Sequence, residues 1–360
     1  MDLIDEFRNR DLCETLLAHI HSEALHNFTI MEVCGGHTMA LHRFGIPALL
    51  PSTIHLLSGP GCPVCVTGRG FIDQAIELAM HNNISVCTYG DLLRVPGSLT
   101  TLEKARAAGA SIEIIYSPLQ CLEFARENPA MKFVFLGIGF ETTAPASAVT
   151  LVKAAEERID NFYLLSAHKV MPPAMAAIIH AGVKVDGYLC PGHVSTITGT
   201  KMYEPLVNDF KVGCVIAGFE PLDLLQSILM LVRQFNGAEP RVEIQYTRAV
   251  KPEGNPKAQQ IMNQVFEPCD AWWRGLGVLN NSGMQLRPIY QHMDAVLAFG
   301  LNMAEPPDPP GCRCGEVLKG LLKPTQCSLF SKICNPTNPI GACMVSAEGA
   351  CQSFYKYANH

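Results

Sequence analysis

The chain alternates short, uninterrupted apolar runs with segments whose apolar residues recur at helical spacing. Eight of these runs are rich in β-branched or aromatic residues, and each leads into a turn that contains glycine or proline. Runs this short and without polar alternation are typical of parallel strands that are buried on both faces. The eight begin the stretches "FTIMEVCGGH", "IHLLSGPGC", "ISVCTYGD", "IEIIYSP", "FVFLGIGFETT", "FYLLSAHK", "DGYLCPGH" and "CVIAGFEP".

The segments between the runs, such as "GFIDQAIELAMHN" and "PLDLLQSILMLVRQF", predict connecting helices, so the fold class is α/β. Eight units are many for one open sheet, and the pattern breaks at "RENPAM" (126–131). We therefore expect two tandem Rossmann-like, doubly wound parallel-sheet lobes, residues 1–126 and 127–236, with an eight-stranded barrel as the alternative. Beyond residue 236 the pattern becomes irregular and reaches the Pro-rich "AEPPDPPGCRC", which predicts a separate C-terminal mixed module, residues 237–360.

Composition excludes several classes of protein. The 360 residues are 48% hydrophobic and 17% charged, which is enough apolar content for a large core. The net charge of −6 and the lack of a dense Lys/Arg run predict no nucleic-acid partner and no membrane partner. The start "MDLIDEFRNRDLCETLL" lacks a secretory signal pattern, so we expect a cytoplasmic protein. In a reducing compartment, fifteen cysteines point to metal binding or thiol redox chemistry rather than to a disulfide framework.

Unusual residues follow the predicted strands. Because ligands of open α/β sheets bind beyond the carboxyl ends of the strands, one cleft is expected to collect these side chains. They are Cys34, His37, Cys62, Cys65, Asp91, Glu141, His168, His193 and Glu220.

Two of the motifs carry thiols. In "GPGCPVC", Cys62 and Cys65 lie between a strand and a helix, where helix amides favour a thiolate and the spacing allows a disulfide; half of a zinc site and ordinary buried thiols are the alternatives. In "CGGHTM", Cys34 and His37 are three residues apart and offer a soft thiolate and an imidazole to a transition metal. A buried thiol beside a hydrogen-bonded histidine is the simpler explanation of that second pair.

The carboxylates and the remaining histidines have structural explanations as well. Glu141 in "GFETTAP" and Glu220 in "GFEP" follow apolar strands and can simply cap the next helix. His193 in "CPGHVS" and His168 in "SAHKV" can be hydrogen-bonded loop residues. These four side chains take part in chemistry only if they face the Cys34 site.

The C-terminal segment from Cys312 to Cys351 contains six cysteines and no histidine or aspartate, so a metal site there must be rich in thiolates. Zinc ribbons pair their ligands in close Cys-x-x-Cys knuckles. The cysteines chosen here are separated by twelve, six and sixteen residues, which favours an iron–sulfur cluster and leaves zinc as the alternative. The expected ligands are Cys314, Cys327, Cys334 and Cys351, with Cys312 and Cys343 as spare thiols.

Taken together, these motifs resemble those of the HypD family of hydrogenase maturation factors, over nearly the whole chain. The matching stretches are "MEVCGGHT", "GPGCPVCV", "GFETT", "PGHVS", "AGFEPLDLLQ", "WRGLGV" and the cysteine-rich "RCGEVLKGLLKPTQCSLFSKICNPTNPIGACMVSAEGAC". The resemblance implies two Rossmann-like lobes and a [4Fe-4S] module. It also implies a scaffold that, with a small HypC-type chaperone and a HypE-type cyanide donor, builds the iron with two cyanides and one carbon monoxide for [NiFe] hydrogenase.

Carried over motif by motif, the resemblance makes Cys34 the thiolate that transiently holds this iron and Cys62 and Cys65 the thiol–disulfide pair. Cys314, Cys327, Cys334 and Cys351 become the cluster ligands. Two positions depart from the family: Met39 stands where a second histidine is common, and Gly68 where proline is frequent. The first departure removes any role for a second histidine in this motif.

This resemblance gives the motifs a joint chemistry. Reductive release of cyanide from a thiocyanate requires two electrons, which a Cys62–Cys65 dithiol supplies and an iron–sulfur cluster can restore. An iron–sulfur thiol–disulfide oxidoreductase shares the dithiol and the cluster and is the alternative, but it has no need for Cys34 and His37. A zinc-stabilised α/β binding protein is a third hypothesis.

Overall fold

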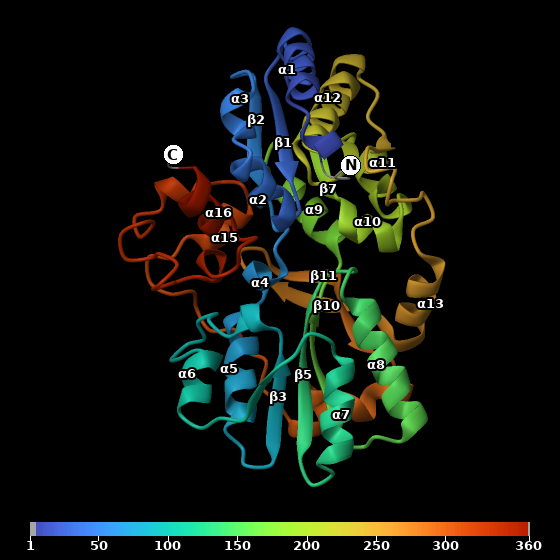
Figure 1. The fold of residues 1–360 in the computed structure, drawn as a ribbon, viewed down its shortest axis with the longest axis vertical. Helices are drawn as coiled ribbons and strands as arrows, with labels where there is room; N and C mark the ends of the chain where they lie inside the picture. Colours follow the sequence, from blue (N-terminus) through green and yellow to red (C-terminus); the bar gives the residue numbers. More distant parts are fainter. Residues whose placement is uncertain (1–4, 359–360) are drawn as a thin grey trace.

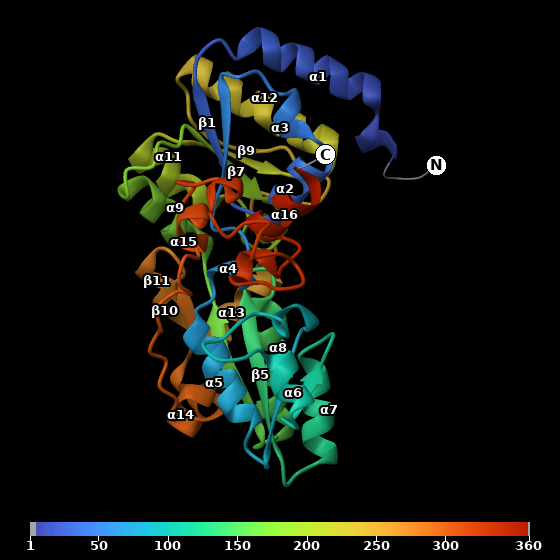
Figure 2. The same cartoon turned by 90° about the vertical axis from the view of Figure 1, so that its left-hand side faces the viewer.

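The structure, a computed structural model, describes residues 5–358 and consists of two stacked lobes with a smaller module at their side (Figures 1 and 2). The first lobe contains a parallel five-stranded sheet with strand order β2-β1-β7-β8-β9. All its strands are parallel, but β2 lies on one side of β1 and the later strands on the other, as in the flavodoxin-like arrangement, so the switch point lies between β1 and β7. The strands are β1 (Phe28–Glu32), β2 (Ile54–Ser58), β7 (Gly187–Pro191), β8 (Gly213–Ala217) and β9 (Val242–Ile244).

The second lobe contains a parallel four-stranded sheet with strand order β4-β3-β5-β6, which has its own switch point between β3 and β5. Every residue of β3 is buried, and so are seven of the eight residues of β5, which explains their uninterrupted apolar sequence. The strands are β3 (Ile84–Thr88), β4 (Ile112–Ile114), β5 (Lys132–Gly139) and β6 (Phe162–His168).

All eight predicted apolar runs are therefore strands, and the two predicted parallel sheets are confirmed. The strands do not follow one another in tandem, however, because β3 to β6 are inserted between β2 and β7 of the first sheet. The expected boundary at residue 126 falls inside the second sheet, where α7 (Leu119–Glu127) leads to β5. The chain thus passes from the first sheet to the second and back again, and α4 (Pro63–Val66), with its "CPVC" sequence, lies on the first of these crossings (Figure 1).

Helices cover both sheets. On one face of the first sheet, α1 (Arg10–Glu23) and α12 (Pro221–Gly237) bury their apolar stripes against Phe28, Ile30 and Val215 (Figure 2). The other helices of this lobe are α2 (Gly35–Arg43), α3 (Ile46–Leu49), α9 (Met171–His180), α10 (Gly192–Thr198) and α11 (Glu204–Phe210). The second lobe has α5 (Arg69–Ala79), α6 (Leu102–Ala107), α7 and α8 (Ala144–Glu157).

The segment after β9 returns along both lobes. The antiparallel hairpin of β10 (Phe266–Trp273) and β11 (Gly277–Leu286) lies between them, preceded by α13 (Pro256–Val265) and followed by α14 (Ala295–Phe299). The cysteine-rich module then packs beside α2 with little regular structure beyond α15 (Cys314–Leu318) and α16 (Ala350–Tyr357) (Figure 1). The 3-10 turns are η1 (Asp5–Arg8), η2 (Gly90–Leu92), η3 (Lys201–Tyr203), η4 (Pro288–Met293), η5 (Pro324–Gln326) and η6 (Ala342–Met344).

One apolar core joins all three parts of the molecule. It runs from Met31 and Tyr188 of the first sheet, through Cys65, to Val86 of the second sheet. On the way it includes buried residues of the C-terminal module such as Leu318. The junction of the lobes is therefore closed by packed side chains, and the motif residues lie at its centre.

Candidate functional site

The Cys-x-x-Cys pair is a buried dithiol at the junction of the lobes. Cys62 begins the short helix α4, and the Cys65 thiol donates to its sulfur across 2.6 Å, while the Cys65 N–H lies 3.3 Å from the same sulfur. A disulfide bond is about 2.05 Å long, so the pair is one small movement from oxidation. Burial, and then contacts with the thiols of Cys343 and Cys62, raise the pKa of Cys65 well above its ordinary value.

Cys34 lies at the switch point of the first sheet, between β1 and α2. Its loop touches the loop of the dithiol: the Gly35 N–H donates to the Gly61 carbonyl oxygen across 3.0 Å. A Cβ atom at Gly61 would overlap the backbone of Cys34, so only glycine permits this approach. Burial, together with the charges of Glu348 and Glu32, raises the pKa of the half-buried Cys34 thiol to about 12, which outweighs the helix amides.

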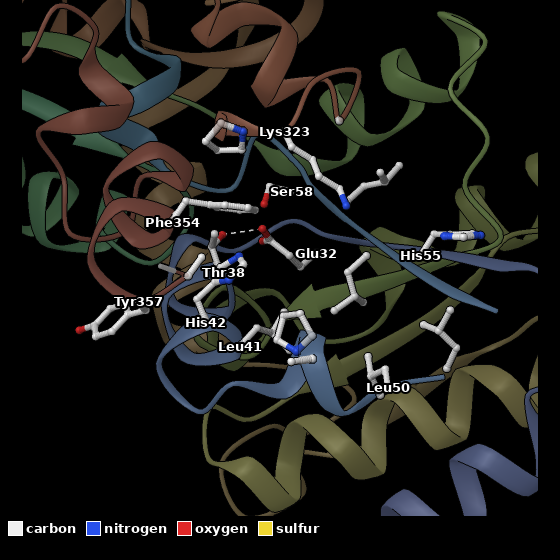
Figure 3. Close-up of a pocket in the computed structure, with 18 of the residues that line it drawn as sticks. Glu32, Thr38, Leu41, His42, Leu50, His55, Ser58, Lys323, Phe354 and Tyr357 are labelled. Atoms are coloured by element: carbon white, nitrogen blue, oxygen red, sulfur yellow. Dashed lines mark hydrogen bonds between the residues drawn. The ribbon is translucent and has the colours of Figure 1, made fainter. Parts of the chain in front are cut away.

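Glu32, one of the residues that raise this pKa, fixes the Cys34 loop from behind. Its carboxyl group accepts the Cys34 N–H across 3.2 Å and the Thr38 hydroxyl across 2.5 Å. Burial raises the pKa of Glu32 to about 8. The same side chain lines a cavity of about 570 Å³ on the outer side of the lobe (Figure 3).

Two histidines enclose the phenyl ring of Phe219 beside Cys34. The His193 ring stacks on it with centroids 4.1 Å apart, and the His37 ring lies 4.8 Å from it. Nε2 of His37 is 3.2 Å from the Ala217 carbonyl oxygen. Burial lowers the pKa of His37 to about 4 and also lowers the pKa of His193, so both rings are neutral near pH 7. His37 is buried and Phe219 half-buried, whereas His193 is exposed, so the three rings form a wall whose His193 end reaches solvent. The structure places both histidines near Cys34.

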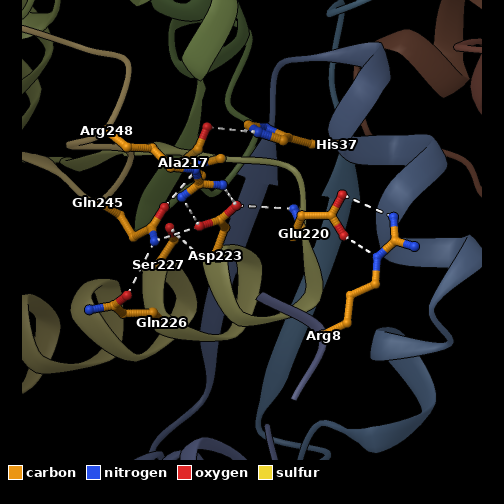
Figure 4. A network of polar contacts seen from close by, with 10 residues as sticks. Arg8, His37, Ala217, Glu220, Asp223, Gln226, Ser227, Gln245 and Arg248 are labelled. Atoms are coloured by element: carbon orange, nitrogen blue, oxygen red, sulfur yellow. Dashed lines mark hydrogen bonds and ion pairs between the residues drawn. The ribbon is translucent and has the colours of Figure 1, made fainter. Parts of the chain in front are cut away.

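Glu220 follows Phe219, but its carboxylate pairs with Arg8, at 2.5 and 3.0 Å (Figure 4). Its backbone N–H donates to Asp223, which in turn pairs with Arg248. Through these contacts the network ties the amino-terminal turn and the end of β8 to the start of α12. Glu220 thus stands beside the Cys34 site with its charge already paired.

Glu141 and His168 belong to the second lobe. Oε1 of Glu141 accepts the N–H of Met171 across 3.1 Å, so it caps α9. The simpler explanation expected a cap on the next helix, α8, whose N-cap is Thr143. Burial raises the pKa of Glu141 to about 7, and its side chain lines a separate cavity of about 380 Å³ with Phe266. His168 is hydrogen-bonded to Ser147 at 2.8 Å. The expected single cleft is therefore divided, and these two residues are not placed with Cys34.

Asp91, in the turn after β3, is exposed. Although the residue is exposed, the turn partly desolvates its carboxyl group, which raises the pKa of Asp91. Its charge in turn contributes to the raised pKa of Glu348. Through Glu348 it lies on the same side of the molecule as Cys34.

The C-terminal cysteines surround one small cavity with Val317 and Phe330. Gly341 passes close to two of the sulfurs, and a Cβ atom there would lie 2.5 Å from Sγ of Cys314. The Cys334 sulfur accepts the Ile340 N–H at 3.4 Å. The five that line the cavity are Cys312, Cys314, Cys327, Cys334 and Cys351, which include all four expected ligands.

Cys343, which the sequence left as a spare thiol, is fully buried between this cavity and the dithiol. Its sulfur contacts the thiols of Cys314 and Cys65, and these contacts lower its pKa. Neither spacing nor motif reveals this position, because the contact joins residues far apart in the chain. A line of neighbouring thiols therefore runs from Cys62 through Cys65 and Cys343 to Cys314.

Arg274, in the "WRGLGV" motif, is a second residue that the sequence analysis did not single out. Its buried guanidinium donates to the carbonyl oxygens of Cys65 and Thr67, each at 3.0 Å, and pairs with Asp308. Its charge also favours the thiolate of Cys343. Arg274 thus joins α4 to the Pro-rich segment that contains Asp308, and it supplies positive charge beside the thiols.

Residues 5–358 contain no group of three or more His, Cys, Asp or Glu side chains arranged to hold a single metal ion. A cubane cluster binds each thiolate through a different iron atom, so its cysteines need not converge on one point. The thiol-lined cavity fits such a cluster in ligand type and number. Within the same residues, no helix has both the length and the apolar character needed to cross a bilayer.

The fold and the thiols define a class of protein: two Rossmann-like sheets whose junction holds a dithiol in line with a cysteine-rich module.

Comparisons with known proteins identify the family to which the chain belongs. The family model HypD, described as "Hydrogenase formation hypA family", matches residues 11–358. Hydrogenase maturation factors HypD of Escherichia coli K12 and of Azotobacter vinelandii are each 45% identical to this chain, covering 99% of it and 98% and 97% of their own lengths. HypD of Cupriavidus necator is 43% identical, with coverage of 99% and 97%. The chain belongs to the HypD family of hydrogenase maturation factors.

Proposed function

We propose that this chain is the scaffold on which the Fe(CN)2CO group of [NiFe] hydrogenase is assembled, with a HypC-type chaperone and a HypE-type cyanide donor as partners. In this proposal Cys34 holds the iron, which is cargo, together with a thiolate of the chaperone. The observation that carries the proposal is the direct contact of the Cys34 loop with the dithiol loop, through Gly35 and Gly61. An iron ligand and a two-electron donor then share one site.

The dithiol supplies the two electrons and two protons that the release of cyanide requires. One thiocyanate and the two thiols of Cys62 and Cys65 give the partner's thiol, a Cys62–Cys65 disulfide and hydrogen cyanide. The two thiol sulfurs are oxidised and give up two electrons as their S–S bond forms, the S–CN bond breaks, and the two thiol protons go to the partner's thiol and to cyanide. The 2.6 Å approach of the two sulfurs supports this role, because the disulfide forms with little movement of α4.

The disulfide must be reduced again before another cyanide is released. We propose that Cys314, Cys327, Cys334 and Cys351 hold a [4Fe-4S] cluster, which supplies single electrons when it is bound. Cys343 touches both Cys314 and Cys65 and is the residue through which the module and the dithiol communicate. Arg274 keeps α4 in place and stabilises negative charge on these thiols.

The neutral rings of His37 and His193 and the ring of Phe219 line one side of the iron site at Cys34, with buried His37 on its inner side and exposed His193 at its rim. The half-buried position of Cys34 leaves one side of the site open to the partner proteins. Glu220 holds the amino-terminal turn near this wall through Arg8, which is a positioning role. Glu141 acts on α9 and lies outside this chemistry.

The proposal is tested by Cys34→Ala in the complex copurified anaerobically with the chaperone. We expect the fold and the cluster absorbance to persist, because the module is held by other contacts. The infrared bands of bound cyanide and carbon monoxide should disappear, since one partner cysteine alone leaves the iron without its second thiolate.

Cys13→Ala is the matched control, because Cys13 is a half-buried cysteine on α1, away from the motif loops. It should leave the infrared bands unchanged. A Cys34→Ala complex with bands of normal intensity would contradict the scaffold role and favour the thiol–disulfide oxidoreductase.

A further inference from the structure

The cavity of about 570 Å³ behind Glu32 is a groove along the edge of the first sheet (Figure 3). Its floor is β2, which is the outermost strand and pairs only with β1. One wall comes from α2, α3 and the residues next to them, and the other from the C-terminal module. The groove is therefore distinct from the junction of the lobes, where the thiols lie.

The outer edge of β2 offers unused main-chain hydrogen-bonding groups. The Phe28 N–H donates to the Thr53 carbonyl and the Gly59 N–H to the Glu32 carbonyl, so the odd-numbered residues of this segment face β1. Leu56 and Ser58 then point their N–H and C=O groups away from β1. Within residues 5–358 these four groups have no hydrogen-bond partner. Such an edge is a template for another strand.

The two walls suit the alternating side chains of an added strand. On one side Leu41, Pro47 and Leu50 are apolar, and on the other side Leu322 and Phe354 are apolar. Successive side chains of a strand point to opposite faces, so a strand laid on β2 would direct them in turn to each wall. The cavity volume is sufficient for two or three such side chains.

The charged residues of the groove favour a ligand with a negative charge. Lys323 is exposed and lies at the rim, where Figure 3 shows its side chain beside the cavity. Glu32 is the one carboxylate among the described lining residues, and it is buried and hydrogen-bonded to Thr38 and Cys34. A ligand that carries an acidic side chain therefore gains an ion pair and meets no exposed carboxylate.

We propose that this groove binds an extended, acidic–apolar segment of a partner protein, which adds to β2 as a sixth strand of the first sheet. Main-chain pairing with Leu56 and Ser58 supplies the register, the walls hold alternate apolar side chains, and Lys323 pairs with an acidic residue. Glu32 links the groove wall to the Cys34 amide, so the bound segment lies directly behind the Cys34 loop. This inference is independent of the proposed function.

The test uses the full-length protein and a hexapeptide of alternating leucine and threonine with a terminal glutamate. At saturating peptide, we expect amide hydrogen exchange at Leu56 and Ser58 to slow by about tenfold or more, because each amide gains a partner. The same peptide, N-methylated at alternate amides, keeps its side chains but cannot pair and should bind at least about tenfold more weakly. This comparison uses the unmodified protein and needs no variant to fold.

Two variants complete the test. Leu56→Pro removes an outward N–H from an edge strand without touching the pairing with β1, and it should weaken peptide binding. Lys323→Glu should weaken it as well, whereas Lys332→Glu, at an exposed lysine outside the groove, should not. Equal binding of the N-methylated peptide, or no slowing of exchange at millimolar peptide, would overturn the proposal. Concentration-dependent dimerisation that Leu56→Pro abolishes would assign the groove to a second copy of the chain and overturn it equally.

Discussion

The sulfur of Cys343 contacts the thiol of Cys65, which joins the C-terminal module to the dithiol at the junction of the lobes. Both residues are fully buried, so neither thiol is in contact with bulk solvent. Cys343 is thus the thiol of the C-terminal module that lies against the buried dithiol.

Cys343→Ser should therefore slow re-reduction of a Cys62–Cys65 disulfide by at least about tenfold. The Cys343 thiol can attack Cys65 to give a Cys65–Cys343 disulfide and a free Cys62 thiol, and two electrons from the module and two protons then reduce the new disulfide, whereas a hydroxyl cannot take part in this exchange. The protein is oxidised mildly, reduced with dithionite, and the two thiols are counted by alkylation and mass spectrometry. Cys121→Ser, at a buried cysteine of the second lobe, is the control and should leave the rate unchanged. A variant that also loses its iron–sulfur absorbance would show that Cys343 is a cluster ligand instead.

The cluster ligands are tested by single serine replacements. Cys314→Ser, Cys327→Ser, Cys334→Ser and Cys351→Ser should each abolish the brown absorbance of the anaerobically purified protein, because an alkoxide is a poor substitute for a thiolate. Cys312→Ser is the strictest control, because Cys312 lines the same cavity but is not an expected ligand. If Cys312→Ser loses the cluster while Cys327→Ser retains it in full, Cys312 is the fourth ligand.

The sequence predicts local features of this fold well and long-range features poorly. Strands such as β3, β7 and β8 are buried at every position, which requires apolar residues throughout, and that requirement is visible in the run itself. The edge strands β2 and β4 are partly exposed, and their apolar residues still mark them as strands. The distribution of the eight runs between the sheets was not predictable, since nothing in the local sequence shows that β2 pairs with β1 and β3 with β5. The chain order of the runs favoured tandem lobes, and the crossing at α4 overrides it.

The same distinction holds for the site. The Cys62–Cys65 pair is recognisable because three residues of spacing and a helix start decide its geometry. The contact of Cys343 with Cys65 depends on how the module packs, so spacing cannot show it. Likewise, Glu220 is a plausible catalytic carboxylate until the structure places Arg8 against it.

The close approach of Gly61 to Cys34 predicts a large effect of a single methyl group. Gly61→Ala should destabilise the protein by about 2–4 kcal/mol, because the new Cβ atom overlaps backbone that cannot move without separating the two loops. Gly237→Ala, where nothing lies within 4 Å of the added Cβ, should change stability by less than about 1 kcal/mol. Urea unfolding followed by circular dichroism measures both. Equal stabilities of the two variants would mean that the loops separate freely.

Glu32 predicts a specific dependence of stability on pH. Its pKa is about 8 in the fold and ordinarily 4.5, so between these values the unfolded chain releases a proton that the native protein keeps. The contribution of Glu32 is therefore fully present below about pH 4.5, and it is lost as pH rises toward 8, with a slope of at most about 1.4 kcal/mol per pH unit. Glu32→Gln, which resembles the protonated acid and still offers an oxygen to the Cys34 N–H, should flatten this decline.

Urea unfolding at several pH values from 5 to 8 measures the slope, with Glu123→Gln at an exposed position as the control. Other buried groups, Glu141 among them, add their own slope to both variants, so the prediction concerns the difference between Glu32→Gln and the control. If the two variants show the same slope, Glu32 is ionised in the native protein and its burial is compensated by charges that the described contacts do not include.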